Sequence, residues 1–337
     1  LKIMAKVRWG ILGAARVNER LLPAIANATN GQLISIGSRR AGAAKECLIK
    51  FAPELQDQVQ CFDGLDSVIH HEKVDAIYIP MANEEHVEPA LKSIRAKKHV
   101  LIEKPMALKL RDVEALINEA KIHNVKIMEG FMYAFHPQFN RIKNVIQSNI
   151  LGDINYAYSM FSFPIQPARF YRINRSMNHG GGALWDIGPY AIHTLRHCFK
   201  ENPVRVYAQS KLNEHGADIS TSGMIDFGDN KRATFDISFE CTRRSEFEAF
   251  GPLGRVKCPL VWQPENIPAK IIYSTEKSGI QEEIVPTANH FELEIKHFNE
   301  VIQSNIEFKL SANDAIWNVK TLEGIQKSIK NNEWITL

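Results

Sequence analysis

The chain has 337 residues, a formal net charge of +3 and 45% apolar residues, which suits a globular protein large enough for two domains. The small charge excludes an obvious nucleic-acid or membrane-surface partner, and no apolar stretch reaches transmembrane length. The five cysteines are scattered and odd in number, which predicts reduced thiols in a cytoplasmic protein, without a zinc or redox motif.

Strand and helix patterns alternate along the first 131 residues. Short apolar strands are predicted at 7–13, 32–38, 59–62, 74–80, 99–104 and 126–131. Helices are predicted between them, at 14–26, 43–51, 65–70, 85–96 and around 113–120. This alternation with short connections is typical of a doubly wound parallel sheet. We therefore expect an α/β, Rossmann-type domain over residues 1–131.

The turn after the first strand carries an incomplete dinucleotide fingerprint. Gly13 can make the tight turn, but Ala15 and Asn18 stand where the second and third glycines are usual. A pyrophosphate would bind here, where a helix N-terminus offers free N–H groups. The cofactor residues predicted in this turn are Gly10, Gly13, Ala14, Ala15 and Arg16.

The second strand ends in a hydroxyl and two guanidinium groups, Ser38, Arg39 and Arg40. An acidic residue at this place would bind the ribose 2′-hydroxyl of NAD. Arginine instead suits the 2′-phosphate of NADP. The sequence therefore predicts NADP, with NAD less favoured. The alternative is that both arginines are solvated in a surface loop.

The fifth strand ends in the charged pair Glu103-Lys104 followed by Pro105. In an open α/β sheet, ligands bind at this carboxyl edge. A lysine held there beside a carboxylate is suited to proton chemistry, and the alternative is an ion pair that closes the strand end. Further cofactor contacts predicted at this edge are Pro80, Asn83, His86, Glu103, Lys104 and Glu129.

From about residue 132 the apolar pattern changes to a period of two. Strands are predicted around 154–160, 204–208, 219–227, 233–239, 247–250, 255–258, 271–274 and 282–285, and helices at 135–148, 288–303 and 312–330. This indicates an α+β domain over residues 132–337 with a large, mainly antiparallel sheet, its last helices free to pack back on the first domain. Helices would cover one face of the sheet. The open face would meet a second copy, in a homodimer or homotetramer.

The three glycines 180–182 precede a candidate acid–base set. A helix that begins near them would place Asp186, Tyr190 and His193 on one face. Pro189 tolerates only a first-turn position or a kink in such a helix. The alternative is a polar stripe that bonds to neighbouring loops. His193 and His197 have a metal-site spacing but lack the acidic partner of a zincin, so no metal is predicted. Substrate contacts are predicted at Arg172, Arg175 and His193.

These residues resemble motifs of the Gfo/Idh/MocA family, which includes glucose–fructose oxidoreductase and inositol dehydrogenase. The resemblance covers essentially the whole chain. It rests on Glu103-Lys104-Pro105 with Asn83 and His86, on the 181–190 stretch, and on residues 128–137 and 151–153. It implies a nicotinamide-dependent oxidoreductase acting on a carbinol or ketone carbon of a sugar or related diol, with Lys104 as a catalytic residue. In inositol dehydrogenases the Asp is followed four residues later by a His, whereas in this chain Asp186 is followed by Tyr190. In this respect the chain resembles dihydrodiol dehydrogenase, xylose dehydrogenases and sugar ketoreductases.

The mechanism that we expect is hydride transfer between nicotinamide C4 and a carbinol carbon. Tyr190 would exchange the hydroxyl proton, with its pKa of about 10 lowered by the nearby Lys104. Lys104 would hydrogen-bond the substrate oxygen, and Asp186 would orient Lys104 or bind a substrate hydroxyl. The competing interpretation is a non-catalytic NADP-binding sensor or regulator of the same fold. A metal hydrolase is a distant third.

Overall fold

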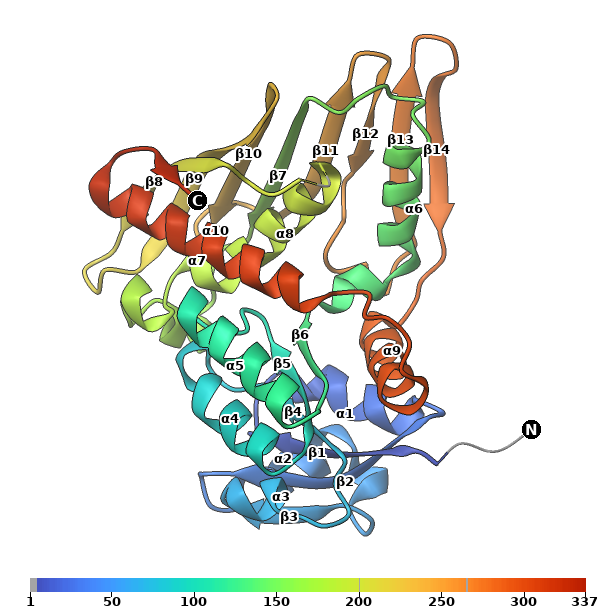
Figure 1. Ribbon diagram of the computed structural model, residues 1–337, viewed down its shortest axis with the longest axis vertical. Coiled ribbons are helices and arrows are strands. Elements are labelled where there is room, and N and C mark those ends of the chain that lie inside the picture. The colour runs from blue at the N-terminus through green and yellow to red at the C-terminus, as the bar shows by residue number, and fades with distance from the viewer. Residues whose placement is uncertain (1–4, 200, 265) are drawn as a thin grey trace. The chain divides into compact units, whose positions relative to one another are not determined.

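The computed structural model describes residues 5–199, 201–264 and 266–337 (Figure 1). They form two compact units. The first contains the chain up to Met132 together with Asn289–Ile316, and the second contains Tyr133–Ala288 together with Trp317–Leu337. The second unit is therefore not one continuous segment, because a helix from the C-terminal part returns to the first.

The first unit is built on a six-stranded parallel sheet in the order β3-β2-β1-β4-β5-β6. Its strands are β1 (Val7–Leu12), β2 (Gly31–Ser38), β3 (Gln60–Asp63), β4 (Ala76–Ile79), β5 (His99–Glu103) and β6 (Ile127–Gly130). Strand interiors such as Ile77 and Leu101 are fully buried, as expected for strands covered on both faces. The predicted Rossmann-type sheet is thus confirmed, and the chain order reverses between β1 and β4, where such sheets bind ligands.

The helices of this unit connect successive strands. They are α1 (Asn18–Asn27), α2 (Ala43–Phe51), α3 (Asp66–Ile69), α4 (Val87–Arg95) and α5 (Leu110–Ile122). The first begins at Asn18, later than the predicted Ala14. The buried Asn18 amide donates to Gly13 O at 2.9 Å and to Cys47 Sγ at 3.2 Å, so it holds the turn before the helix in place.

Helix α9 (His290–Ser304) belongs to the first unit, although it follows the second unit in sequence. It packs against α1 and buries Phe298 beside Trp9, with ring centroids 5.7 Å apart. Trp9 Nε1 also donates to Asn299 Oδ1 at 2.9 Å. This apolar and hydrogen-bonded contact explains why the helix returns to the first sheet.

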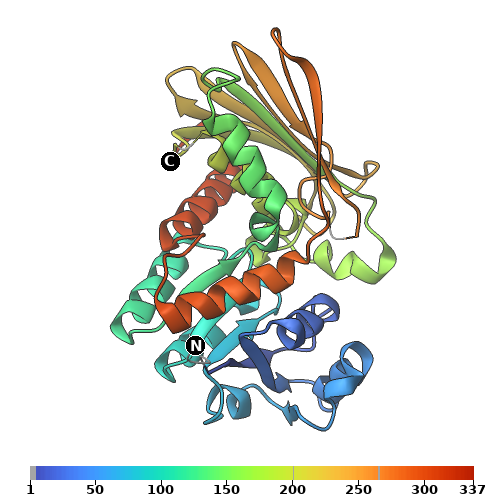
Figure 2. The ribbon, with the colours of Figure 1, turned by 90° about the vertical axis from the view of Figure 1, so that its right-hand side faces the viewer.

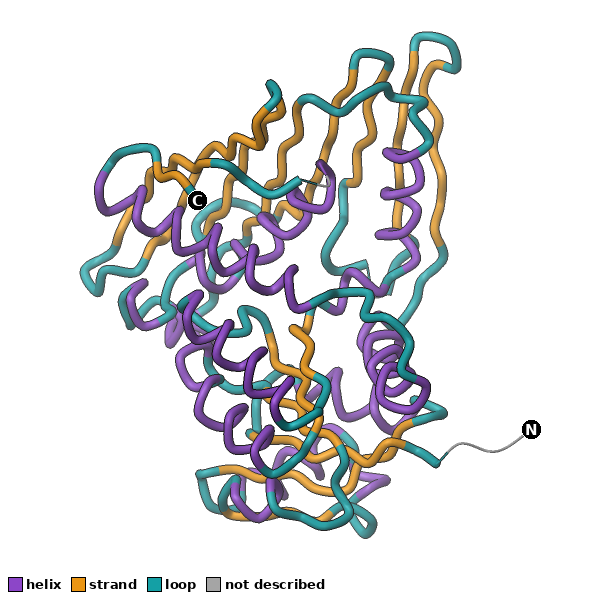
Figure 3. Tube along the Cα trace, viewed as in Figure 1, coloured by secondary structure: helices purple, strands orange, loops and turns teal. Residues whose placement is uncertain are grey.

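The second unit contains a nine-stranded sheet in the order β14-β13-β12-β11-β7-β10-β9-β8-β15. Figure 3 draws the strands in orange. Its strands are β7 (Tyr156–Ser162), β8 (Arg205–Leu212), β9 (Asp218–Gly228), β10 (Lys231–Ser238), β11 (Arg244–Gly251), β12 (Gly254–Cys258), β13 (Ala269–Thr275), β14 (Gly279–Val285) and β15 (Ile335–Thr336). Among the described strands of this second sheet, only β10 and β7 pair in parallel. The predicted large, mainly antiparallel sheet is confirmed; the two-residue β15 carried no pattern that predicted it.

Helices lie on one face of this sheet (Figure 2). They are α6 (Pro137–Gln147), α7 (Ala183–Asp186) and α8 (Gly188–Phe199), followed at the C-terminus by α10 (Ala312–Asn331). In β7, Ser159 and Phe161 are buried, and α8 packs on this strand. Tyr158 and Met160 alternate with them and are partly exposed. No helix in the described part of the chain is long and apolar enough to cross a membrane.

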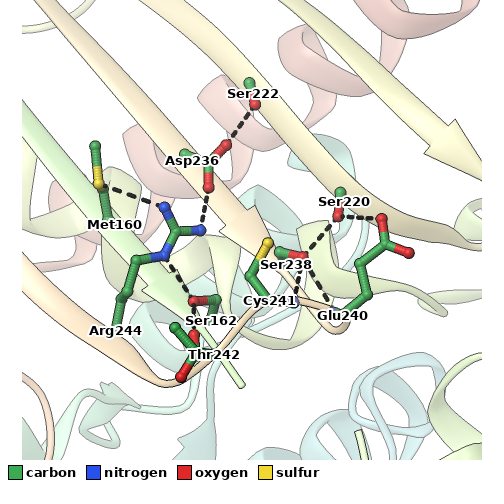
Figure 4. A network of polar contacts seen from close by, with 10 residues as sticks. All are labelled: Met160, Ser162, Ser220, Ser222, Asp236, Ser238, Glu240, Cys241, Thr242 and Arg244. Atoms are coloured by element: carbon green, nitrogen blue, oxygen red, sulfur yellow. Dashed lines mark hydrogen bonds and ion pairs between the residues drawn. The ribbon is translucent and has the colours of Figure 1, made fainter. Parts of the chain in front are cut away.

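The opposite face of the sheet carries a polar network (Figure 4). Arg244 Nε donates to Ser162 Oγ at 2.8 Å, and its Nη2 is bonded to Asp236. Asp236 also accepts a hydrogen bond from Ser222 Oγ at 2.6 Å. Arg244 and Asp236 are therefore an ion pair within this face.

Candidate active site

A groove of about 360 Å³ lies at the carboxyl ends of β1, β2 and β4. It is lined by predicted cofactor residues, namely Gly13, Ala14, Ala15, Ser38, Arg39, Arg40 and Pro80. It is also lined by residues that the sequence did not single out, namely Ala43, Leu65, Met81, Ala82 and Glu85. Their positions at the switch point of the sheet are those expected for a nucleotide site.

The turn after β1 fits a dinucleotide pyrophosphate. Gly13 has a φ of +126°, a conformation that L side chains rarely adopt, and its N–H donates to Gly37 O at 2.8 Å. The small side chains of Ala14 and Ala15 leave the main chain of the turn accessible. Gly10 has a different role, because a Cβ there would lie 2.6 Å from Val68 Cγ1. It is needed for packing inside the sheet and does not line the groove.

Both arginines after β2 have carboxylate partners. Arg39 Nη2 lies 2.5 Å from Glu85 Oε1, and Arg40 Nη2 lies 2.7 Å from Glu46 Oε2. Ser38 Oγ accepts a hydrogen bond from Arg40 N at 3.3 Å. Ser38, Arg39 and Arg40 all line the groove, and a hydroxyl and guanidinium groups are suited to a 2′-phosphate. Arg16 is exposed and is not among the lining residues.

Lys104 follows β5 directly and is only 8% exposed. The preceding Glu103 accepts a hydrogen bond from Tyr78 Oη at 2.5 Å. Tyr78 is itself fully buried in β4, so the neighbouring strand fixes the carboxylate. The sequence did not single out Tyr78, because an aromatic residue in a buried strand looks like core.

His86 fixes the two segments that follow β4 and β5. It has no exposed surface, and its Nδ1 and Nε2 lie 2.8 Å from Pro105 O and 3.0 Å from Met81 O. Burial holds its pKa below the ordinary value, against the effect of the two carbonyl groups. His86 is thus placed to position the loops, and both ring nitrogens already face main-chain carbonyls, unlike the direct cofactor contact that we expected.

Glu129 has a similar main-chain role. It is 4% exposed, and its Oε1 accepts a hydrogen bond from Met106 N at 2.7 Å. This bond holds the segment that leaves the Glu-Lys-Pro motif. Asn83 lies in the partly exposed 3-10 helix η2 (Asn83–Glu85) after β4.

In the second unit, the expected single helix over the acid–base set is wrong. Helix α7 ends at Asp186 and α8 begins at Gly188, with Ile187 between them. Pro189 lies in the first turn of α8, where its missing N–H costs little. The helical spacing from Asp186 to Tyr190 and His193 is therefore interrupted.

Asp186 is buried and forms ion pairs with two arginines of the 3-10 helix η4 (Pro167–Arg172). Arg169 Nη2 lies 3.4 Å from Asp186 Oδ2, and Arg172 Nη1 pairs with Oδ1. Burial by itself would lower the pKa of Arg172. The interactions with Asp186, Tyr171 and Tyr190 have a larger effect together and raise this pKa above its ordinary value. Asp186, Arg172 and Tyr190 thus form one electrostatic cluster. Tyr190 is 7% exposed.

His193 belongs to a buried network. It has no exposed surface, and its Nδ1 lies 2.6 Å from Tyr133 Oη. The same hydroxyl is 2.9 Å from Thr194 Oγ1, which donates to Tyr190 O. These contacts of His193 anchor α8, and its contact with a substrate stays a prediction. Arg175 is partly exposed, and its Nε donates to Tyr171 O at 3.2 Å.

Asp218 of β9 is a residue that the sequence reasoning missed. It is fully buried, and its Oδ2 accepts hydrogen bonds from Leu184 N at 2.8 Å and Thr221 Oγ1 at 2.7 Å. Burial raises the pKa of Asp218 to about 6. Because a Cβ on Gly182 would lie 1.9 Å from its Oδ1, this carboxyl explains the last glycine of the 180–182 run.

Comparisons with known proteins agree with these two units. Residues 7–131 match the model of the Gfo/Idh/MocA oxidoreductase family with an NAD-binding Rossmann fold, and residues 139–257 match the C-terminal domain of that family. The chain is 27% identical to a dTDP-3,4-didehydro-2,6-dideoxy-alpha-D-glucose 3-reductase of Saccharopolyspora spinosa, over 82% of both proteins. It is 25% identical to a D-xylose 1-dehydrogenase (NADP(+)) of Haloferax volcanii, over 98% of this chain and 99% of the relative. The chain also resembles a solved structure of KijD10, a 3-ketoreductase from Actinomadura kijaniata in complex with NADP and TDP-benzene. The TM-score is 0.88 and the sequence identity 23%, and the match covers 96% of this chain and 98% of that chain.

Proposed function

Because the chain belongs to the Gfo/Idh/MocA family of oxidoreductases, we propose that it is an NADP-dependent dehydrogenase or reductase of a sugar, a sugar derivative or a related diol. The observation that carries this proposal is the groove that combines the Gly13 turn with Ser38, Arg39 and Arg40. The named relatives, a deoxysugar reductase and a xylose dehydrogenase, support the substrate class.

The groove offers a partner for each charged part of the cofactor. The main chain around Gly13 would bind the pyrophosphate, and Ser38, Arg39 and Arg40 would bind the 2′-phosphate. When bound, the nicotinamide would supply or accept a hydride.

The catalytic proposal assigns the remaining steps to side chains. The Lys104 ammonium would donate a hydrogen bond to the reacting oxygen and stabilise its negative charge. Tyr190 would exchange the hydroxyl proton with the substrate. The neighbouring Arg172 cation would favour the deprotonated phenol, and Asp186 would hold Arg172 in place.

The first test is a fluorescence titration of the purified protein with NADPH and, separately, NADH. One charge-assisted hydrogen bond contributes about 1.5–3 kcal/mol, so we expect NADPH to bind about tenfold tighter or better. Equal binding would mean that the arginines give no net preference for a 2′-phosphate. Binding of neither would contradict the dinucleotide site. Tight binding without turnover on a panel of sugars, keto-sugars and diols would favour the non-catalytic sensor.

We also propose that the open face of the nine-stranded sheet contacts a second copy of the chain. Two ion pairs lie within this face, since Asp236 binds Arg244 and Glu248 lies 3.1 Å from Arg255. Burying these pairs together would not leave any of their four charges unpaired. Met224 is 43% exposed on this face and would supply apolar contact.

Sedimentation velocity tests this assembly. We expect a dimer or tetramer for the unmodified protein and a shift towards monomer for Met224→Glu, because the new charge would be buried at the interface. Ile122→Glu is the matched control, since Ile122 is 66% exposed on α5 in the other unit. A monomeric unmodified protein would contradict the proposal.

The five cysteines are all free thiols. Reduced thiols are typical of the cytoplasm, which supports the location that we expected from the sequence. Fractionation of the source cells would test it, and recovery of the protein outside the cytoplasm would contradict it.

A further inference from the structure

We propose that Glu85 sets the cofactor selectivity of this protein by competing with the 2′-phosphate of NADP for Arg39, so that NAD is also accepted. The proposal rests on the proposed function, because it requires the adenosine half of the cofactor to lie in the groove beside Ser38.

The ion pair between Arg39 and Glu85 joins two loops at the carboxyl edge of the first sheet. Arg39 follows β2, whereas Glu85 ends η2 after β4. Their Nη2 and Oε1 atoms lie 2.5 Å apart. Both residues line the cofactor groove, and both also line a neighbouring groove of about 380 Å³. The pair therefore forms part of the wall between the two grooves.

Glu85 places a negative charge where a phosphate dianion would have to bind. A guanidinium has five N–H donors, so Arg39 could bind the phosphate while still paired with Glu85. The carboxylate would then lie near the phosphate and repel it. If Glu85 instead moved away from Arg39 to make room for the phosphate, the free energy of the existing ion pair would be lost. Either way, Glu85 weakens the binding of NADP.

The same carboxylate does not oppose NAD, which has a neutral 2′-hydroxyl. A carboxylate can accept a hydrogen bond from a ribose hydroxyl, as the acidic residue after the second strand does in NAD-binding Rossmann proteins. In this chain the acidic group comes from the loop after β4. The groove thus combines cations suited to NADP with an acid suited to NAD.

Glu46 is a weaker competitor than Glu85. It pairs with Arg40 at 2.7 Å, but the side chains of Glu46 and Arg40 are 65% and 69% exposed. The Glu85 side chain is 32% exposed and that of its partner Arg39 is 61% exposed. Water and salt screen exposed charges strongly, so we assign the selectivity to Glu85, the less exposed of the two carboxylates.

The test compares NADPH and NADH titrations of the unmodified full chain, Glu85→Gln and Glu88→Gln. Glu85→Gln removes the charge and keeps the shape, so we expect the ratio of NADPH to NADH affinity to rise at least about fivefold. Glu88→Gln makes the same charge change on α4. Glu88 lines only the neighbouring groove and pairs with Lys92 at 3.3 Å, so this variant should change the ratio less than about twofold.

Competition with 2′,5′-ADP and 5′-AMP locates the effect. Glu85→Gln should strengthen binding of 2′,5′-ADP and leave 5′-AMP unchanged, because only the first carries a 2′-phosphate. An unchanged ratio would overturn the proposal. Weaker NADPH binding would also overturn it, since Glu85 would then be positioning Arg39 for the phosphate. Failure of the unmodified protein to bind either dinucleotide would overturn the proposed function itself, and this inference with it.

Discussion

Lys104→Ala should lower turnover at least about a hundredfold, the low end for the loss of acid–base and electrostatic catalysis. Lys104 directly follows β5, is 8% exposed, and comes after a carboxylate that is held by Tyr78. A charge held in such a place stabilises negative charge on a substrate oxygen more strongly than a solvated lysine can. The measurement is kcat on the best substrate of the sugar panel, with NADPH affinity determined in parallel.

The parallel titration separates catalysis from binding. If Lys104 acts on the substrate oxygen, NADPH should still bind the variant while kcat falls. Lys121→Ala is the matched control, because Lys121 is an exposed lysine on α5, and its activity should not change. Full activity of Lys104→Ala would end the catalytic proposal.

Tyr190→Phe tests the other residue of the proposed acid–base pair and should lower kcat by a similar factor. The phenylalanine ring would keep the packing of Tyr190 against Tyr133 and Phe161, whose centroids lie 5.9 and 5.8 Å away. A fall in kcat with an unchanged melting temperature would therefore report the hydroxyl group. A fully active variant would remove Tyr190 from the mechanism.

Gly182→Ala should destabilise the second unit by roughly 2–6 kcal/mol, the sum of backbone strain and overpacking. Gly182 has a φ of +93°, and an added Cβ would lie 1.9 Å from Asp218 Oδ1 and 2.8 Å from Asp218 N. Neither of these two atoms lies at the end of a long, flexible side chain, so neither can easily move away from the added Cβ. Urea unfolding measures the change in the free energy of unfolding.

Gly279→Ala is the control for backbone strain. Gly279 has a φ of +63°, but a Cβ there would have nothing within 4 Å. Its substitution should cost only the strain part, so the difference between the two variants reports the clash with Asp218. The double variant Gly182→Ala/Asp218→Ala should lose less stability than the sum of the two single variants, because the clash with Oδ1 is removed in it. Equal costs for the two glycine variants would contradict this account.

Most of the fold could be predicted from local patterns. The apolar run at 100–102 predicted a buried strand, and the helix over 43–51 has the predicted bounds. These predictions succeed because the alternation of apolar residues reflects which side of each element is buried. The carboxyl edge of the parallel sheet then follows from chain direction, which is why Lys104 and the arginines after β2 could be named in advance.

The details of the candidate site depended on contacts between distant segments. The burial of His193 and the pairing of Arg39 with Glu85 have no local signal in the sequence, whereas Pro189 is a local signal for the break between α7 and α8. The glycine run 180–182 predicts an unusual backbone conformation. It does not predict that the carboxyl group of Asp218 fills the space where a side chain of Gly182 would lie.

The sequence by itself determined the two sheets, the family resemblance and the residue types at the ends of the strands. Only the tertiary structure decided what each polar side chain binds. Asp218 and Leu184 are separated by 34 residues, and Arg39 and Glu85 by 46. The physical reason is that periodicity records burial along one element, whereas a hydrogen bond or ion pair depends on which two loops the fold brings together.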